Sequence, residues 1–152
     1  MIARGLWCAS AVLLALAGCE STPEREARAS EVRRDVVIQF SDTSVEPTVA
    51  RVEQGGSVAW TSLASSYTGV VSFPATIVGR FTCKELRPDF IVDGDRLVSS
   101  RPLRGDGESL ALPCPLQRGT YPYRIELGQG GDMGAGRELD PMRSLPASLV
   151  VE

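Results

Sequence analysis

From Asp35 to the C-terminus, the sequence consists of short apolar or alternating runs separated by Gly, Pro, Ser and Asp. Alternation with a period of two is the pattern of strands that bury one face, and such frequent turn residues are typical of β-sandwiches. No window shows a helical stripe longer than two turns. We therefore expect residues 35–152 to form one all-β sandwich domain, with strands at 36–40, 49–52, 58–61, 70–73, 75–83, 90–92, 110–112, 120–127 and 148–151.

Two turns are prominent in this region. The stretch from Glu53 to Gly56 should join strands 49–52 and 58–61 into a hairpin, because glycine accepts the backbone conformations of tight turns. Asp93-Gly94-Asp95 lies between apolar pairs and predicts an Asp-Gly hairpin turn. A calcium loop is the alternative for this acidic turn, but no further acidic ligands follow at loop spacing.

The N-terminus does not follow the alternating pattern. Arg4 precedes an apolar run, Leu6 to Leu16, which is shorter than the roughly 20 residues that span a bilayer but fits the core of a signal peptide. The run ends in Leu16-Ala17-Gly18-Cys19, which resembles the lipobox of bacterial lipoproteins. The resemblance implies that residues 1–18 are removed and that Cys19 carries diacylglycerol and a further acyl chain such as palmitate. An ordinary cleavage site with a chance cysteine is the alternative.

Residues 19–34 then form the connection between lipid and domain. The segment from Glu20 to Arg34 is dense in charge and nearly free of large apolar side chains, so we expect a flexible tether, with a short surface helix as the alternative. The lipoprotein resemblance implies a location in the cell envelope with the membrane as a partner. Glu20, rather than Asp, after the modified cysteine favours the outer membrane under the enterobacterial sorting rule.

Two cysteines remain in the domain after the signal peptide is removed and Cys19 is modified. Exported proteins enter an oxidising compartment, so Cys83 and Cys114 are expected to form a disulfide. The alternative is a pair of free thiols that bind a soft metal, although no CxxC spacing accompanies them.

Charge and composition exclude several classes of function. The chain has 16 basic and 19 acidic residues, with the basic ones scattered, so nucleic acid is not an expected partner. It has no histidine, the commonest general base and imidazole metal ligand. The glycine-rich stretch 128–136 lacks the lysine and the helix of a phosphate-binding loop. A carboxylate enzyme is a further alternative; its candidates, all in turn-like segments, are Asp93, Asp95, Asp106 and Glu108.

Two stretches resemble the cupredoxins, the Greek-key sandwiches of the blue copper proteins. Val45 to Ser62 matches the family's proline, alternation, glycine turn and Val-x-Trp strand, and Arg118 to Tyr123 matches its Gly-Thr-Tyr-x-Tyr strand. Ser148 to Val151 would supply the closing strand. The resemblance implies a Greek-key β-sandwich of cupredoxin-like type over residues 35–152, and an immunoglobulin-like or fibronectin-like sandwich is the alternative. It also implies a copper site of two histidines, one cysteine and an axial methionine.

The positions of those copper ligands carry other residues. The two histidines fall on Gly69 and Gly128, and the cysteine falls on Ile125; only Met133 matches, as the axial methionine. We therefore expect no cofactor, no metal site beyond Met133 as a weak candidate, and a site that has closed into an apolar pocket.

The function expected from this pattern is non-catalytic: binding, assembly or envelope structure. An unidentified envelope protein or ligand would contact the face that covers copper in the family. The expected contact residues on this face are Tyr67, Gly69, Ile125, Gly128 and Met133. The alternative is metal handling or electron transfer through Met133, Met142 or reduced cysteines.

Overall fold

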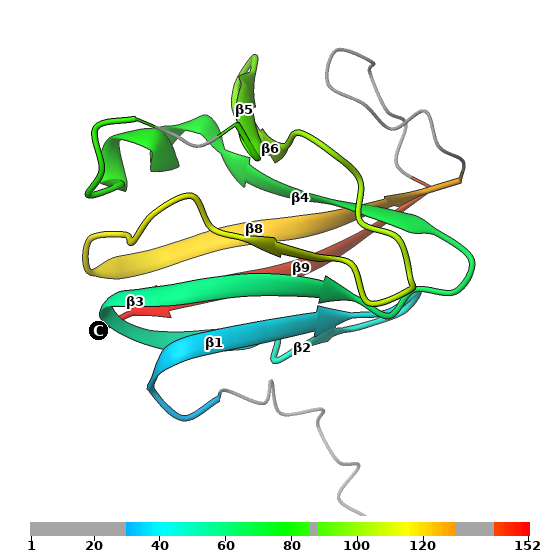
Figure 1. The fold of residues 1–152 in the computed structure, drawn as a ribbon, viewed down its shortest axis with the longest axis horizontal. Coiled ribbons are helices and arrows are strands. Elements are labelled where there is room, and N and C mark those ends of the chain that lie inside the picture. Colours follow the sequence, from blue (N-terminus) through cyan, green and yellow to red (C-terminus); the bar gives the residue numbers. More distant parts are fainter. Residues whose placement is uncertain (1–29, 86–87, 130–141) are drawn as a thin grey trace, which may run out of the picture.

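The computed structural model describes residues 30–85, 88–129 and 142–152, and its elements are almost all strands (Figure 1). The elements are β1 (Arg33–Phe40), β2 (Val45–Glu46), β3 (Val49–Ser62), β4 (Thr68–Pro74), the 3₁₀ helix η1 (Ala75–Arg80), β5 (Phe90–Asp93), β6 (Arg96–Ser99), β7 (Ser109–Ala111), β8 (Gly119–Gly128) and β9 (Arg143–Val151). The expectation of an all-β fold is confirmed.

The strands pair in the order β2-β1-β3-β9-β8-β4-β6-β5, and β7 pairs with β3 off this path. The arrangement is mixed, because β3 is parallel to both β1 and β9 whereas β8 is antiparallel to β9 and β4. β3 serves both halves of the molecule: Val49–Val52 pairs with β9, and Ser57–Ser62 pairs with β1. The chain turns back between these two arms, as Figure 1 shows.

The turn in β3 lies at Gly55–Gly56, as the sequence predicts. Gly55 has a φ of 85°, and a Cβ on Gly56 would lie 2.1 Å from the carbonyl oxygen of Arg34, so both positions require glycine. The two arms do not form the expected hairpin ladder: among the pairings of the described strands, the first arm pairs with β9 and, at Val52, with Arg33 of β1, and the second arm pairs with β1 and β7. The turn therefore carries the chain from one layer of the sandwich to the other.

The core lies between the two layers and centres on Trp60 of β3, which is fully buried. Its ring makes edge contacts with Phe73 of β4, Phe90 of β5 and Tyr123 of β8, with centroids 5.8, 6.3 and 5.6 Å away. None of these strands pairs with the arm of β3 that carries Trp60, so the contacts cross between layers. Such edge-to-face contacts each add about 0.5–1.5 kcal/mol to simple burial.

One expected strand is wrong. Residues 75–83 do not extend β4; Ala75–Arg80 forms the 3₁₀ helix η1, which buries Ile77. The edge of β4 opposite β8 is already occupied by β6, and the amide of Ala75 donates to the carbonyl of Asp95 in the β5–β6 turn. The β5–β6 hairpin itself follows the Asp-Gly prediction, with Asp93 paired to Arg96 and Gly94 at a φ of 59°.

The ordered domain begins before Asp35. β1 starts at Arg33, and the amide of Ser30 donates to the carbonyl of Val49 across 3.1 Å. The expected tether thus contributes its last residues to the sheet, because β3 offers partners to them. The signal peptide, Cys19 and residues 20–29 lie outside the described residues. No helix among the residues that the structure describes is long and apolar enough to cross a membrane.

The predicted disulfide between Cys83 and Cys114 is present, with the two Cα atoms 6.1 Å apart. It joins the segment after η1 to the segment before β8. Backbone contacts lie next to it: Phe81 bridges to Leu116, and the amide of Thr82 donates to the carbonyl of Pro115. Both cysteines are therefore part of the scaffold, and the alternative of a thiol metal site does not hold.

Candidate functional site

Three of the expected contact residues come together where β4 pairs with β8. Val71 is opposite Ile125, Gly69 is opposite Leu127, and Thr68 is opposite Gly128. A hydrogen bond from the Thr68 hydroxyl to the carbonyl of Gly128 adds to this end of the ladder. The residues that the cupredoxin resemblance aligns with copper ligands are thus neighbours in space, although 56 positions separate Gly69 from Ile125 in the sequence.

The space between them is filled. A Cβ on Gly69 would lie 2.4 Å from Cε2 of Phe40, a distance that real side chains do not show, and 3.1 Å from Cγ2 of Ile125, which is a tight contact. Phe40 is 1% exposed and Ile125 is fully buried. A side chain at position 69 would therefore have to displace the Phe40 ring. The expected apolar closure of this region is present in the packing.

The expected contact surface requires a correction. Gly69, Ile125 and Gly128 are buried and Tyr67 is half-buried against the core, so these side chains do not form an exposed surface. Gly69 and Ile125 are on the inner side because the alternation of β4 and β8 directs Val71, Phe73, Tyr123 and Ile125 to that side, whereas Gly128 alternates to the other side and is buried there. Met133 lies outside the described residues.

The exposed part of this end of the molecule is formed by loops. Asp42, after β1, accepts hydrogen bonds from the Ser65 hydroxyl and from the amides of Ser65 and Ser66. Partial desolvation raises the pKa of Asp42, but these hydrogen bonds outweigh it and leave the pKa below its ordinary value. Arg143 of β9 donates to the Asp42 carbonyl across 2.9 Å, which connects a third segment to the same loop.

Large apolar side chains are exposed beside the hydrogen bonds that Asp42 makes with Ser65, Ser66 and Arg143. Leu63 is 52% exposed and Met142 is 62% exposed, and they lie in the segments that Asp42 and Arg143 hold together. Two exposed apolar side chains are ordinary for a protein surface and do not by themselves define a partner.

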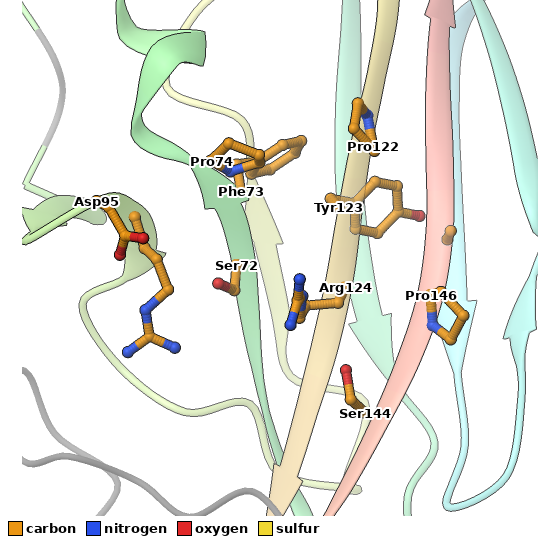
Figure 2. Close-up of a pocket in the computed structure, with 11 residues that line it drawn as sticks. Ser72, Phe73, Pro74, Asp95, Pro122, Tyr123, Arg124, Ser144 and Pro146 are labelled. Carbon is orange, nitrogen blue, oxygen red and sulfur yellow. The ribbon is translucent and has the colours of Figure 1, made fainter.

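A second feature lies on the outer face of the β4–β8–β9 layer (Figure 2). Here a groove of about 660 Å³ runs across four strands and the β5–β6 turn. Its labelled residues Ser72, Pro74, Pro122, Arg124 and Pro146 are the alternate positions that face away from Trp60. The sequence analysis did not identify this groove, because its strands are distant in sequence; proline and arginine at alternating positions of Thr120 to Leu127 were the available signal.

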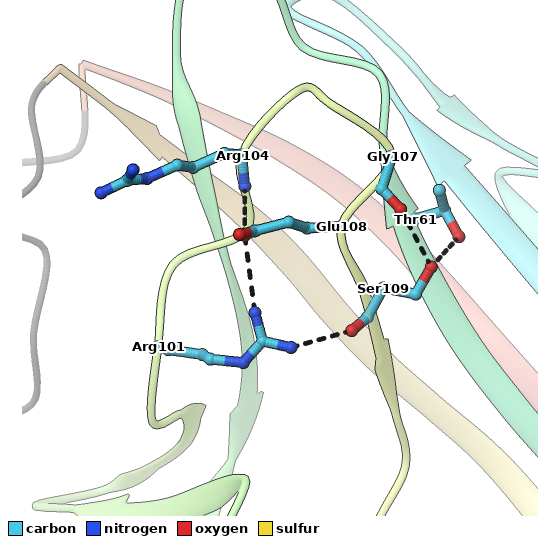
Figure 3. Close-up of polar contacts among 6 residues, drawn as sticks. All are labelled: Thr61, Arg101, Arg104, Gly107, Glu108 and Ser109. Carbon is cyan, nitrogen blue, oxygen red and sulfur yellow. Dashed lines mark hydrogen bonds and ion pairs between the residues drawn. The ribbon is translucent and has the colours of Figure 1, made fainter.

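The loop before β7 is organised by Glu108 (Figure 3). The Glu108 carboxylate accepts from the Arg104 amide at 3.0 Å and pairs with the Arg101 guanidinium at 3.5 Å, while Arg101 also donates to the Ser109 carbonyl. A Cβ on Gly105 would lie 1.4 Å from the Ala64 carbonyl oxygen, so this loop packs directly on the loop after β3. Glu108 is therefore used in holding the loop.

The four carboxylates of the enzyme alternative fall in two separate places, with Asp106 in the same loop as Glu108. Asp93 and Asp95 belong to the β5–β6 hairpin, whereas Asp106 is in the loop before β7. In the described part of the chain, no three His, Cys, Asp or Glu side chains form a group that could hold a metal ion.

Comparisons with known proteins place the chain in no family, since no family model and no curated protein matches it. Among solved structures, auracyanin A, a blue copper protein from Chloroflexus aurantiacus, is 13% identical with a TM-score of 0.42, over 79% of this chain and 99% of that chain. Dithionite-reduced auracyanin from Roseiflexus castenholzii is 14% identical with a TM-score of 0.40, over 82% and 99%. A cysteine protease inhibitor from Entamoeba histolytica is 12% identical with a TM-score of 0.40, over 81% and 99%.

At these values the likenesses assign no ligand, activity or partner to the chain. The class of the protein, a mixed-sheet all-β sandwich, rests on the strand pairing and the core described above.

Proposed function

We propose that this protein is a membrane-anchored, non-catalytic lipoprotein whose cupredoxin-like domain works without copper, in binding, assembly or envelope structure. The observation that carries the proposal is the packing of Phe40 against Gly69 and Ile125, which occupies the position where the resemblance would put a copper ligand. The lipobox-like sequence from Leu16 to Cys19 supports the anchor, and Glu20 supports the outer membrane.

The packing also argues against a closed or hidden copper site. Copper in this family is bound by imidazole and thiolate side chains that surround the space that the metal ion fills. Here the corresponding side chains are hydrogen, isoleucine and hydrogen, and the two cysteines of the domain are joined to each other. A scaffold that keeps its core without these ligands can still present its loops to a partner, which is why we favour a binding role.

Copper titration tests the copper-free part of the proposal. The purified protein, incubated with Cu(II), should develop no intense visible band and should keep the same melting temperature by circular dichroism. A ligand that binds only the folded state raises its stability by mass action, so a melting temperature that rises steeply with copper would contradict the proposal.

Cell fractionation tests the anchor. Cys19→Ser should leave the chain uncleaved or released from the membrane fraction, because the serine hydroxyl cannot accept the thioether-linked lipid. Cys8→Ser is the matched control: it makes the same change inside the segment that is expected to be removed and should leave the membrane fraction unchanged. Normal processing and membrane partition of Cys19→Ser would reject the lipoprotein assignment.

A further inference from the structure

The groove on the outer face of β4, β8 and β9 lies on a different surface from the loops discussed above, and its floor is polar at one point. Ser72, in the middle of β4, is only 3% exposed, and its hydroxyl makes no hydrogen bond with any residue that the structure describes. The hydroxyl oxygen is not among the fully buried polar atoms without a partner, so it keeps some access from the groove. A hydroxyl that opens into a groove and has no protein partner is available to donate a hydrogen bond to a bound group. In Figure 2 the Ser72 hydroxyl points toward the side of β4 on which Asp95 lies, and Arg124 lies on the other side of Ser72.

A guanidinium lies beside this hydroxyl. Arg124 is directly opposite Ser72 in the β4–β8 ladder, and its side chain extends toward β4 over the same face. Directly paired positions have Cβ atoms about 4.5–5.5 Å apart, so the two side chains can hold one ligand atom group between them. Arg124 is exposed and makes no ion pair or hydrogen bond with any residue that the structure describes.

The second arginine of the groove is already occupied. Arg96 of β6 donates to both carboxylate oxygens of Glu126 at 3.0 Å and lies 3.8 Å from a carboxylate oxygen of Asp93. Glu126 is 2% exposed, so this pair forms a fixed, neutralised border of the groove. Among the described residues that line the groove, Arg124, next to Ser72, is therefore the cation without an ion pair, and Asp95 at the far end would repel a second negative charge.

The walls beside Arg124 are apolar and rigid. Pro146 is opposite Arg124 in the β8–β9 ladder, and Pro122 is two residues away on the same face, with Pro74 across β4. Pyrrolidine rings offer apolar surface that loses no side-chain rotamer freedom on binding. A ligand that fits this lining has one anionic group and an apolar body.

We propose that this groove binds an organic carboxylate. The two carboxylate oxygens accept two parallel hydrogen bonds from the Arg124 guanidinium, and one of them also accepts a hydrogen bond from the Ser72 hydroxyl. The apolar body of the ligand lies on Pro122 and Pro146. A carboxylate fits better than a phosphate, because arginine binds the planar group through two parallel bonds and the nearby acids disfavour a dianion.

The test is an amide-resolved NMR titration of the purified protein with benzoate, benzamide and inorganic phosphate. Benzoate should bind with a Kd of about millimolar, as expected for a ligand of nine heavy atoms, and shift the amides of Phe73, Tyr123 and Ala147. Benzamide, which has the same shape without the charge, and phosphate, which lacks the apolar body, should each bind at least tenfold more weakly.

Two variants and one control complete the test. Arg124→Gln and Ser72→Ala should each weaken benzoate binding, the first by tenfold or more, whereas Arg118→Gln, an exposed arginine outside the groove, should leave it unchanged. Spectra of the free variants check that each remains folded. Equal shifts with benzamide or phosphate, no shifts at tens of millimolar benzoate, or unchanged binding in folded Arg124→Gln would each overturn the proposal.

Discussion

At the scale of single residues, two buried tyrosines of β8 differ in the hydrogen bonding of their hydroxyl groups. Tyr121 is buried and donates to the carbonyl of Gln117 across 2.7 Å, an arrangement like the tyrosine corner of other sandwiches. Tyr123, two residues later on the same face, has a buried hydroxyl without a hydrogen-bond partner in the described structure, as has the indole nitrogen of Trp60. The two unpaired groups are close enough to interact electrostatically but do not form a hydrogen bond.

The comparison predicts opposite effects of removing the two hydroxyls. Tyr123→Phe should leave the free energy of unfolding unchanged or raise it by up to about 1 kcal/mol. The Tyr123 hydroxyl loses its hydrogen bonds to water on folding and gains none in the protein, so its removal costs nothing. Tyr121→Phe should lower the free energy of unfolding by about 1 kcal/mol through the lost hydrogen bond. Urea unfolding of both variants measures this; a larger loss for Tyr123→Phe than for Tyr121→Phe would contradict the assignment.

The same hydroxyl predicts a pH effect. Burial raises the pKa of Tyr123, and the Trp60 indole N–H opposes this only in part. Above pH 10.0, the ordinary pKa of tyrosine, the unfolded chain loses this proton while the folded chain keeps it. The contribution of Tyr123 to stability is therefore intact below pH 10.0 and falls by about 1.4 kcal/mol per pH unit above it. Unfolding curves from pH 9 to 11 should show this slope in the native protein, and Tyr123→Phe should remove it.

At the scale of elements, the outer face of the β8–β4–β6 layer contains one ion pair that spans a strand. Arg96 of β6 and Glu126 of β8 meet across β4, above the small cluster of Val70, Val98 and Ile91. The Glu126 side chain is 3% exposed, and the Arg96 side chain is 34% exposed. The carboxylate thus depends on its partner far more than the guanidinium does.

This asymmetry predicts that the two halves of the pair are not equivalent. Arg96→Met should cost about 3–5 kcal/mol, because it leaves the buried Glu126 charge without a partner. Glu126→Gln should lower the free energy of unfolding by about 1 kcal/mol, because the Arg96 guanidinium still contacts solvent and still forms its ion pair with Asp93. Chemical denaturation of both variants measures the difference, and equal losses would show that the carboxylate is not the dependent partner.

The disulfide is the second feature that stabilises the packing between elements. Cys83 and Cys114 are 31 residues apart in sequence, so the bond closes a loop that the unfolded chain would otherwise leave open. The double variant Cys83→Ala/Cys114→Ala should lower the free energy of unfolding by roughly 3–4 kcal/mol in the chain-entropy model. Adding reductant to the native protein should lower its stability by a similar amount and leave the double variant unaffected; no effect on the native protein would mean that the loop is already restrained.

At the scale of the whole molecule, the C-terminus completes the sandwich. Ser148–Val151 of β9 pairs with Val49–Val52 of β3, and the amide of Gln54 donates to the carbonyl of Glu152. Leu149 is fully buried and Val151 is 5% exposed. These contacts join segments about 100 residues apart and so hold the two ends of the domain together.

Removal of residues 148–152 should therefore abolish cooperative folding rather than weaken it. Circular dichroism of the truncated chain should show no sharp thermal transition. Glu152→Gln is the control: it removes only the exposed ion pair with Arg51 and should cost no more than about 1 kcal/mol. A cooperative transition in the truncated chain would mean that β3 does not need β9.

The sequence by itself determined the class of fold, because alternation and turn residues act locally: the Asp93–Asp95 turn, the bend at Gly55–Gly56 and the strands around Trp60 and Tyr123 follow from neighbours in the chain. It also determined the disulfide, since two cysteines remained in an expected exported domain. Tertiary structure decided the rest. The pairing of β4 with β6 ends at Pro74 and residues 75–80 form η1, the Phe40 ring fills the space at Gly69, and the groove around Ser72 and Arg124 joins strands separated by some 70 residues. Each of these depends on contacts between segments that are distant in sequence, and no local pattern encodes such contacts.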